Sequence, residues 1–370
     1  MNQPIGESAV IVIDLQKCFL PGGNLPTTNS RNTKNNKNNN KMITHLGTDT
    51  NKFIKELKPN NLFISLDWHP EDHISFIKPE LIKMGKKSMV DPEINHSAPG
   101  KPFLTSIQAY KKEDIKPRVW HKDDKLNHTR QTLWTPHCIQ NNSQAMVDES
   151  LKIQELINFN PKYVLKGFTP NVDSYSVVAD ALGNPTPYIY EGKDLTQFKH
   201  DDNVKTTFLT TLQNSNINIV YLTGIARNVC VFWSAMDLLE FWILPAYFGI
   251  GDGNKKIIKL IFVYDLTRPV VSGLFDKDLD ISKESINNKI EELINKYKEV
   301  NNSTNKEDTQ SIISKIFQIF DSSDIITLNG GSIKHKNYNY NKTKKTRKYK
   351  FRKIHNNKSR KTRKTKSKKY

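Results

Sequence analysis

The chain has 370 residues, of which 36% are hydrophobic, so it is long and apolar enough for one large domain or two small ones. It contains no run of about 18 or more apolar residues, which argues against a transmembrane helix. Its first residues, MNQPIGESAVIVID, lack the basic and apolar regions of a secretory signal. Three cysteines, an odd and sparse set, do not suggest a disulfide framework. We therefore expect an intracellular, cytoplasmic protein that does not contact membranes.

The net charge of +18 is concentrated at the C-terminus. Residues 334–370 hold 18 of the 56 Lys and Arg residues and no Asp or Glu, which leaves 38 basic against 38 acidic residues elsewhere. We predict a folded body at 1–330 and a disordered basic tail at 331–370. The tail could bind nucleic acid or another polyanion, act as a nuclear address, or be merely solvated.

Short apolar runs alternate with helical patterns along the body. Residues 9–15 (AVIVIDL) predict a buried parallel strand that ends in a carboxylate. Residues 29–41 are polar and Asn-rich, which predicts a disordered loop insertion, and 78–133 predict a long irregular excursion over the active-site face. Further strands are predicted at 61–69, 162–167, 217–225 and 259–270, with a sixth candidate at 324–328. Helices are predicted at 50–57, 147–158, 171–182, 202–216, 228–241, 282–300 and 308–320, so that extra helices occupy 276–320.

This alternation predicts an α/β fold, a doubly wound and mainly parallel sheet with helices on both faces. In such sheets ligands bind beyond the carboxyl ends of the strands. Asp14, Asp67, Lys166 and the turn at 224–230 each lie at such an end. We therefore expect them to meet at one rim of the sheet.

Five of the longer motifs follow one another in a fixed order. They are DWHPEDHISF at 67–76, NHSAPGKPF at 95–103, WTPHCIQ at 134–140, KGFTPNVDSYS at 166–176 and TGIARNVCV at 223–231. Together with VIDLQ at 12–16 they resemble the nicotinamidase branch of the isochorismatase-like cysteine hydrolases, over about residues 8–275. The resemblance implies the isochorismatase-like hydrolase fold, a Cys–Asp–Lys triad and a zinc-like divalent metal. It also implies hydrolysis of nicotinamide to nicotinate and ammonia, a step of NAD salvage.

The sequence departs from the family pattern next to two of these motifs. Lys17 and Cys18 stand where the family often has Asn and Asp. Arg227, Asn228 and Val229 stand where it usually has Thr, an acidic residue and an aromatic one. These positions bear on the shape and charge of the pocket, so the identity of the amide is more open than the type of reaction.

Three side chains at the strand ends suit nucleophilic hydrolysis. Cys230 would open a helix, where unpaired N–H groups and the positive helix end lower the pKa of a thiol. Asp14 could take the thiol proton and later give it to the leaving ammonia. Lys166 could favour the thiolate and hold the carboxylate. The plain alternatives are a buried core cysteine, an acid that accepts loop hydrogen bonds and a surface lysine.

The backbone and the aromatic residues nearby complete the predicted site. The N–H groups of Ala226 and Cys230 would form an oxyanion hole. Phe19 and Trp68 flank the acid and the metal ligands, and could provide aromatic walls for a flat heteroaromatic amide. Ordinary core packing is the alternative for both rings.

A compact set of metal ligands precedes the triad lysine. Asp67 and His69 are two positions apart in an extended segment, so both can point to one ion, and His137 is the third candidate. Mixed nitrogen and oxygen ligands with open positions suit catalytic zinc, with iron or manganese as alternatives. His73 is a candidate fourth ligand, directly or through water.

Alternative functions remain open at this point. One is a related cysteine hydrolase that acts on another small amide or on an isochorismate-like ether. Another is an inactive protein with the hydrolase fold, whose basic tail binds nucleic acid. The expected partner of the body is a small-molecule amide, and an oligomer is compatible with the sequence.

Overall fold

The computed structural model describes much of the predicted body. It covers residues 7–27, 45–77, 105–116, 118–119, 130–190, 195, 206–250, 255–269, 282–301 and 307–330. The chain divides into two units after Gly331, and every element below belongs to the first. The predicted loop insertion at 29–41 and the predicted tail at 331–370 lie outside the described residues.

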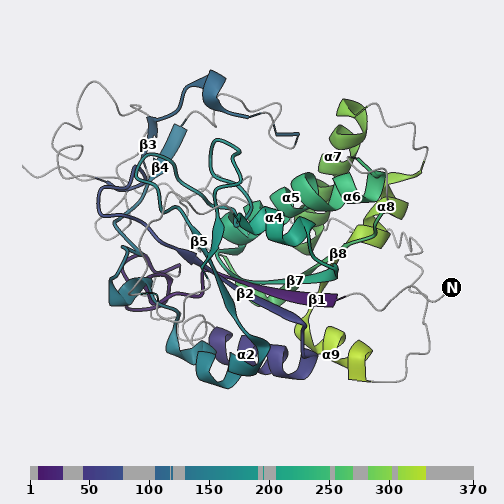
Figure 1. The fold of residues 1–370 in the computed structure, drawn as a ribbon, viewed down its shortest axis with the longest axis horizontal. Helices are drawn as coiled ribbons and strands as arrows, with labels where there is room; N and C mark the ends of the chain where they lie inside the picture. The colour runs from purple at the N-terminus through teal and green to yellow at the C-terminus, as the bar shows by residue number, and fades with distance from the viewer. Residues whose placement is uncertain are drawn as a thin grey trace, which may run out of the picture. The chain divides into compact units, whose positions relative to one another are not determined.

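A seven-stranded sheet forms the centre of this unit, in the order β6-β5-β2-β1-β7-β8-β9 (Figure 1). Its parallel strands are β1 (Glu7–Ile13), β2 (Asn61–Asp67), β5 (Lys162–Lys166), β7 (Ile217–Ile225), β8 (Lys259–Arg268) and β9 (Phe317–Phe320). The short β6 (Tyr188–Tyr190) is antiparallel to β5. The predicted doubly wound, mainly parallel sheet is confirmed.

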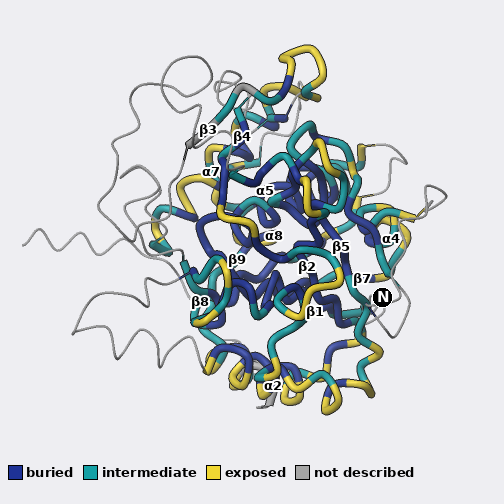
Figure 2. Tube along the Cα trace, turned by 90° about the vertical axis from the view of Figure 1, so that its left-hand side faces the viewer, coloured by how far each residue is buried: buried dark blue, intermediate teal, exposed yellow. Residues whose placement is uncertain are grey.

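Side chains of the central strand alternate between two apolar cores. In β1, Ala9, Ile11 and Ile13 pack on one face of the sheet, and Val10 and Val12 pack on the other. The strand is buried on both faces, which explains its continuous apolar sequence (Figure 2).

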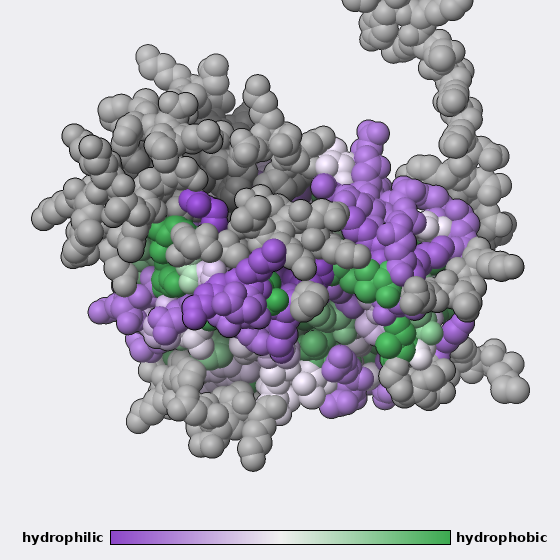
Figure 3. Space-filling view, turned by 90° about the horizontal axis from the view of Figure 1, so that it is seen from above, coloured by the Kyte–Doolittle hydropathy of each residue, from purple (hydrophilic) through white to green (hydrophobic). Residues whose placement is uncertain are grey.

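Helices cover both faces, as predicted. On the first face lie α4 (Phe208–Gln213), α5 (Phe232–Leu238), α6 (Leu244–Phe248), α7 (Lys283–Val300) and α8 (Thr309–Ile316). On the second lie α2 (Leu46–Leu57) and α9 (Ser322–Gly330) (Figure 1). Seen from above, the described surface is a mixture of polar side chains and separate apolar clusters (Figure 3).

The predicted helix at 228–241 is part of a longer helical run. Two π-helical segments, η8 (Arg227–Val231) and η9 (Leu239–Ile243), continue α5 on either side into α6. Within the described residues, this run at 227–248 is the one helix long and apolar enough to cross a membrane. Its apolar window is 78% buried inside the protein, which is the pattern of a core helix.

Several predicted helices differ in the structure. No helix forms at 171–182, because side chains there bond the nearby backbone instead: Ser174 N–H donates to Asp173, Val178 N–H to Ser176 and Leu182 N–H to Asp180. Residues 147–158 form 3-10 turns, η5 (Glu149–Leu151) and η6 (Ile153–Phe159). Within 202–216, the described helix is limited to α4.

Two predictions near the C-terminus are wrong in type. The helix predicted at 308–320 ends at Ile316, and the chain continues directly into β9. The candidate strand at 324–328 lies inside α9. Both are short apolar runs, for which periodicity does not separate strand from helix.

The excursion at 78–133 contains a small second sheet. Its antiparallel strands are β3 (Thr105–Gln108) and β4 (Arg130–Leu133), and the turn η2 (Lys112–Asp114) lies between them in sequence.

Two further 3-10 turns, η1 (Lys17–Phe19) and η4 (Ser143–Ala145), contact one another close to the end of β1.

Candidate active site

Three charged side chains meet where β1, β2 and β5 end. The Lys166 ammonium lies 2.9 Å from Asp14 Oδ2 and also pairs with Asp67 Oδ1. It donates to the Ser174 carbonyl at 3.1 Å. Lys166 and Asp14 are fully buried. The predicted meeting of these residues at one rim is therefore what the structure shows.

Burial and pairing set the protonation of this cluster. Burial raises the pKa of Asp14 to about 6, against the opposing effect of Lys166. Burial also works against the charge of Lys166, but Asp14 and Asp67 outweigh it and raise the lysine pKa well above its ordinary value. Burial works against the charge of Asp67 as well, yet Lys166 and then His69 hold its pKa well below the usual range. The cluster is one ammonium held between two carboxylates of different acidity.

Asp14 is fixed by its neighbour strand. Its backbone has a left-handed φ of 47°, and its Oδ1 accepts from the Ser65 hydroxyl at 2.6 Å. Gln16, two residues on, donates to the Asp67 carbonyl at 2.8 Å and accepts from the Asp67 N–H at 2.9 Å. These bonds lock the end of β1 to the end of β2, and so set the spacing between the two carboxylates.

Cys230 lies on η8, directly after β7, with its sulfur 3.6 Å from the Lys166 ammonium. Burial raises the pKa of this thiol well above its ordinary value, against the effect of Lys166, and a hydrogen bond with Asp14 adds to the rise. The predicted lowering of its pKa is therefore wrong for the resting site, because loss of solvent outweighs the helix end. At rest, Cys230 is therefore a neutral thiol that is hydrogen-bonded to the Asp14 carboxylate.

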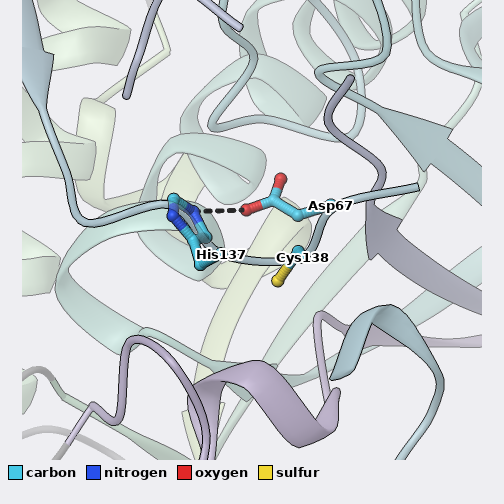
Figure 4. Close-up of side chains that lie close together, drawn as sticks. All are labelled: Asp67, His137 and Cys138. Carbon is cyan, nitrogen blue, oxygen red and sulfur yellow. Dashed lines mark ion pairs between the residues drawn. The ribbon is translucent and has the colours of Figure 1, made fainter. Parts of the chain in front are cut away.

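The predicted metal ligands also converge. Asp67 Oδ2 lies 3.6 Å from His69 Nε2. The same oxygen lies 3.8 Å from His137 Nε2, on the loop that also carries Cys138 (Figure 4). The Nδ1 atom of each histidine forms a hydrogen bond with a backbone carbonyl. His69 Nδ1 bonds the Gly167 carbonyl at 2.7 Å, and His137 Nδ1 bonds the Thr135 carbonyl at 2.8 Å. Donation by Nδ1 leaves the Nε2 lone pairs free to bind an ion. The three residues present therefore fit a divalent cation.

His73 is not arranged like the other three. Its ring stacks on His69 with centroids 4.1 Å apart. Its Nδ1 faces the Ser75 hydroxyl at 2.6 Å and accepts weakly from the Ser75 N–H, so its Nε2 carries the proton and faces the Val172 carbonyl at 3.3 Å. His73 nevertheless offers a ligand atom within 4.8 Å of those of His69 and Asp173, so its role as a fourth ligand stays a prediction.

A disulfide joins two loops of the site. Cys18 and Cys138 are both fully buried and bonded to one another, with Cα atoms 5.6 Å apart. The sequence did not suggest a disulfide framework, and this bond is a correction to that expectation: the fold brings η1 and the loop after β4 together although the two cysteines are 120 positions apart. The bridge lies next to Phe19 and His137, whose rings are in contact at 5.4 Å. Cys230 is the one free cysteine.

A pocket opens above these groups. The described residues that line it are Phe19, Leu25, Pro26, Thr27, Asp67, His69, Trp134, His137, Asp173, Tyr175, Ala226, Val229 and Cys230. It therefore contains the nucleophile candidate, all three metal ligands and both residues of the predicted oxyanion hole. Phe19, Trp134 and Tyr175 give the pocket three aromatic walls. These lining residues include no lysine or arginine.

One predicted wall is wrong. Trp68 is fully buried and packs in the core on the α2 side of the sheet. Side chains alternate along an extended segment, so the residue between Asp67 and His69 must point away from them. Trp134 and Tyr175 supply aromatic surface instead, and the Trp134 N–H donates to the Tyr175 hydroxyl at 3.2 Å. The sequence motifs at 134–140 and 166–176 contained both residues, but gave no sign of where their rings point.

The unusual Arg227 turns away from the pocket. Its guanidinium donates to the Thr267 hydroxyl at 2.7 Å and to the Tyr264 carbonyl at 2.9 Å, and stacks over the Tyr264 ring at 3.7 Å. It thus ties the start of η8 to β8. Of the three positions that depart from the family pattern before the nucleophile, Val229 is the one that reaches the pocket.

Known proteins similar to this chain are nicotinamidases. No family model matches the chain. Two curated nicotinamidases align with it: that of Acinetobacter baylyi at 28% identity, over 62% of this chain and 73% of its own, and that of Schizosaccharomyces pombe at 26%, over 50% and 61%. The chain is thus similar in sequence to curated nicotinamidases. A solved nicotinamidase/pyrazinamidase of Acinetobacter baumanii superposes with a TM-score of 0.46 at 21% identity, over 88% of this chain and 100% of its own.

Proposed function

We propose that this chain is an amidohydrolase that converts nicotinamide to nicotinate and ammonia. The observation that carries the proposal is the placement of Cys230, Asp14 and Lys166 in one buried, bonded cluster that opens on a pocket beside three convergent metal ligands. The related nicotinamidases named above suggest the substrate.

The chemistry begins with a neutral thiol, because burial keeps the proton on Cys230. The sulfur attacks the carboxamide carbon while the Asp14 carboxylate takes its proton. The N–H groups of Ala226 and Cys230 stabilise the oxyanion. Asp14 then gives the proton to the leaving ammonia, and a thioester remains. Water hydrolyses the thioester with Asp14 as the base, which releases the acid and restores the thiol.

Lys166 balances charge throughout these steps. Its ammonium lies between Asp14 and Asp67 and within 3.6 Å of the sulfur. As the proton moves from sulfur to carboxylate, the negative charge shifts between two groups that the same ammonium contacts. The change in electrostatic energy is therefore small.

Asp67, His69 and His137 would hold one divalent ion, for which we propose zinc, with iron or manganese as alternatives. Such an ion would supply a Lewis acid that binds a ring nitrogen or a water and so orients the ring beside Cys230. Phe19, Trp134 and Tyr175 would enclose the ring and exclude bulk water.

A neutral amide fits this pocket better than an isochorismate-like acid. A dicarboxylate substrate would need cationic side chains, yet the described lining residues include two carboxylates, Asp67 and Asp173, and no lysine or arginine. The intact triad also argues against an inactive protein that works through its tail alone.

The direct test is ammonia release from nicotinamide by the purified full chain, with and without a chelator. We expect turnover that a chelator abolishes and a divalent ion restores. Cys230→Ala should lower the rate by more than about 10³-fold and leave the circular dichroism spectrum unchanged, because the thioester cannot form. Near-normal ammonia release by that variant would exclude Cys230 as the nucleophile, and release by metal-free protein would exclude the proposed role of the ion.

A further inference from the structure

A carboxylate outside the catalytic cluster lines the pocket. Asp173 follows β5 in the loop that gives Lys166 its carbonyl partner, and 3% of its surface is exposed. It lies in the pocket wall beside Tyr175 and within 4.8 Å of a ring nitrogen of His69. Nothing in the proposed reaction uses it. A buried carboxylate without a task in the chemistry requires its own explanation.

Neutral donors hold this carboxylate in place. Asp173 Oδ1 accepts from the Ser174 N–H at 2.8 Å, and Oδ2 accepts from the Gln131 side-chain amide at 2.9 Å. The Tyr110 hydroxyl donates to Gln131 Oε1 at 2.8 Å and accepts from the Asp173 N–H at 3.2 Å. The ring of bonds thus reaches from the pocket wall to β4. Its members are almost fully buried, so the orientation of the carboxylate is fixed.

The described side chains around Asp173 provide no lysine or arginine partner, and the proposed ion at Asp67, His69 and His137 would be the nearest full positive charge. No lysine or arginine there forms an ion pair with Asp173, in contrast to Asp14 and Asp67, which share Lys166. The effect on its neighbours agrees: burial and then the charge of Asp173 raise the pKa of Tyr175 well above its ordinary value, and the same two causes raise that of Tyr110. Both phenols therefore stay neutral and add no second negative charge beside Asp173.

We propose that Asp173 is a specificity-determining residue, whose fixed negative charge makes the pocket favour a neutral ligand over an anionic one. The inference rests on the proposed function, in which a neutral amide becomes a carboxylate. Like charges a few ångström apart in a protein interior change an affinity by about tenfold or more. The carboxylate of Asp173 therefore disfavours the product and anionic analogues while leaving the amide unaffected. The same repulsion favours release of the carboxylate product from the pocket.

The test uses the metal-loaded full chain with Cys230→Ala, which binds without turnover. Calorimetry should show tighter binding of nicotinamide than of nicotinate. Adding Asp173→Asn, which keeps the shape, should strengthen nicotinate binding by about tenfold and change nicotinamide binding by less than about twofold. Asp72→Asn is the control: it removes an exposed carboxylate that does not line the pocket, and it should change neither affinity. The metal content of every variant is measured alongside.

Several outcomes overturn the inference. One is an Asp173→Asn variant in which both affinities change equally, or in which the ion is lost, since Asp173 would then serve general binding or the metal ligands. Another is tighter binding of nicotinate than of nicotinamide by the Cys230→Ala protein. This measurement does not use the Asp173 variant, so it tests the inference even if that variant fails to fold. Failure of the proposed function is distinct: the unsubstituted chain would release no ammonia from nicotinamide.

Discussion

Asp14 has the property that a catalytic acid and base needs at neutral pH. Burial raises its pKa to about 6, well above that of a free aspartate. A carboxyl group with this pKa is ionised at neutral pH and can accept a proton, yet is acidic enough to return it to ammonia. Its partner Lys166 stays protonated across the same range.

The pH dependence of the reaction should follow this carboxyl group. Below about pH 6 Asp14 is protonated and cannot accept the thiol proton, so kcat/KM should fall by about tenfold per pH unit on the acid side and level off above pH 7. Steady-state ammonia release between pH 4.5 and 8.5 would measure it. A rate that stays flat down to pH 5 would exclude Asp14 as the base.

Lys166 should matter for stability as well as for the rate. Lys166→Met leaves two buried carboxylates without their shared cation, and the free energy of unfolding should fall by about 3–5 kcal/mol. Urea unfolding followed by circular dichroism would give the value. Lys52→Met is the control, since Lys52 is 72% exposed and its pair with Glu56 at 3.8 Å is weak. Equal midpoints for the two variants would show that the buried cluster does not stabilise the fold.

At the scale of elements, the approach of β7 to β1 places the nucleophile. Gly224 has a φ of 111°, and a Cβ at this position would lie 2.0 Å from the Ile13 carbonyl oxygen. The backbone oxygen cannot move without breaking the pairing of β1 with β7. Gly224 lies near the end of β7, shortly before Cys230, and Ile13 is directly before Asp14. The close contact between Gly224 and Ile13 therefore sets the distance between the nucleophile and the base.

A pair of glycine variants would isolate this close approach. Gly224→Ala should cost about 2–5 kcal/mol of stability, from left-handed strain and overpacking together, and should lower the rate strongly. Gly22 also has a positive φ, 94°, but a Cβ added there would meet no atom within 4 Å, so Gly22→Ala should suffer the strain alone, about 1–2 kcal/mol. Thermal unfolding and activity of both variants would decide. Similar losses would mean that the contact with Ile13 has no special importance.

The sequence predicted these elements well where one strong pattern was enough. Buried parallel strands read as continuous apolar runs, and their polar ends gave Asp14, Asp67 and Lys166. The two-residue spacing of Asp67 and His69 placed both on one side, and the same rule, applied to Trp68, would have placed that ring in the core.

Other features depend on contacts that no local pattern encodes. The bond between Cys18 and Cys138 spans 120 positions, and the pocket walls Trp134 and Tyr175 are placed by tertiary packing. The stretch at 171–182 has helical spacing, but its Ser and Asp side chains satisfy the backbone in turns. The role of each site residue stays a prediction until variants are measured.

For the whole molecule, charge and chemistry are separated along the chain. All the excess positive charge lies in 334–370, and no proposed site residue lies there. Deleting 332–370, at the division after Gly331, should leave ammonia release nearly unchanged and remove affinity for DNA or RNA. Binding by the full chain should weaken steeply as salt is raised, because it would come from counterion release.

A salt series with the full and the truncated chain would test this. If the truncated chain binds nucleic acid as tightly, or if binding is insensitive to salt, the tail is not an electrostatic binding segment. If truncation abolishes ammonia release, the boundary between body and tail is misplaced.

The way the charged cluster is assembled has a consequence for kinetics. Lys166 and Asp67 are 99 positions apart, and their strands pair in parallel, so the cluster forms through non-local contacts that are slow to establish. Local helices such as α2 and α7 can form much earlier. During refolding from urea, ellipticity should therefore recover before ammonia release does. Simultaneous recovery would contradict this order. If the order holds, the enzyme's own turnover marks the moment at which β1, β2 and β5 have all joined the sheet.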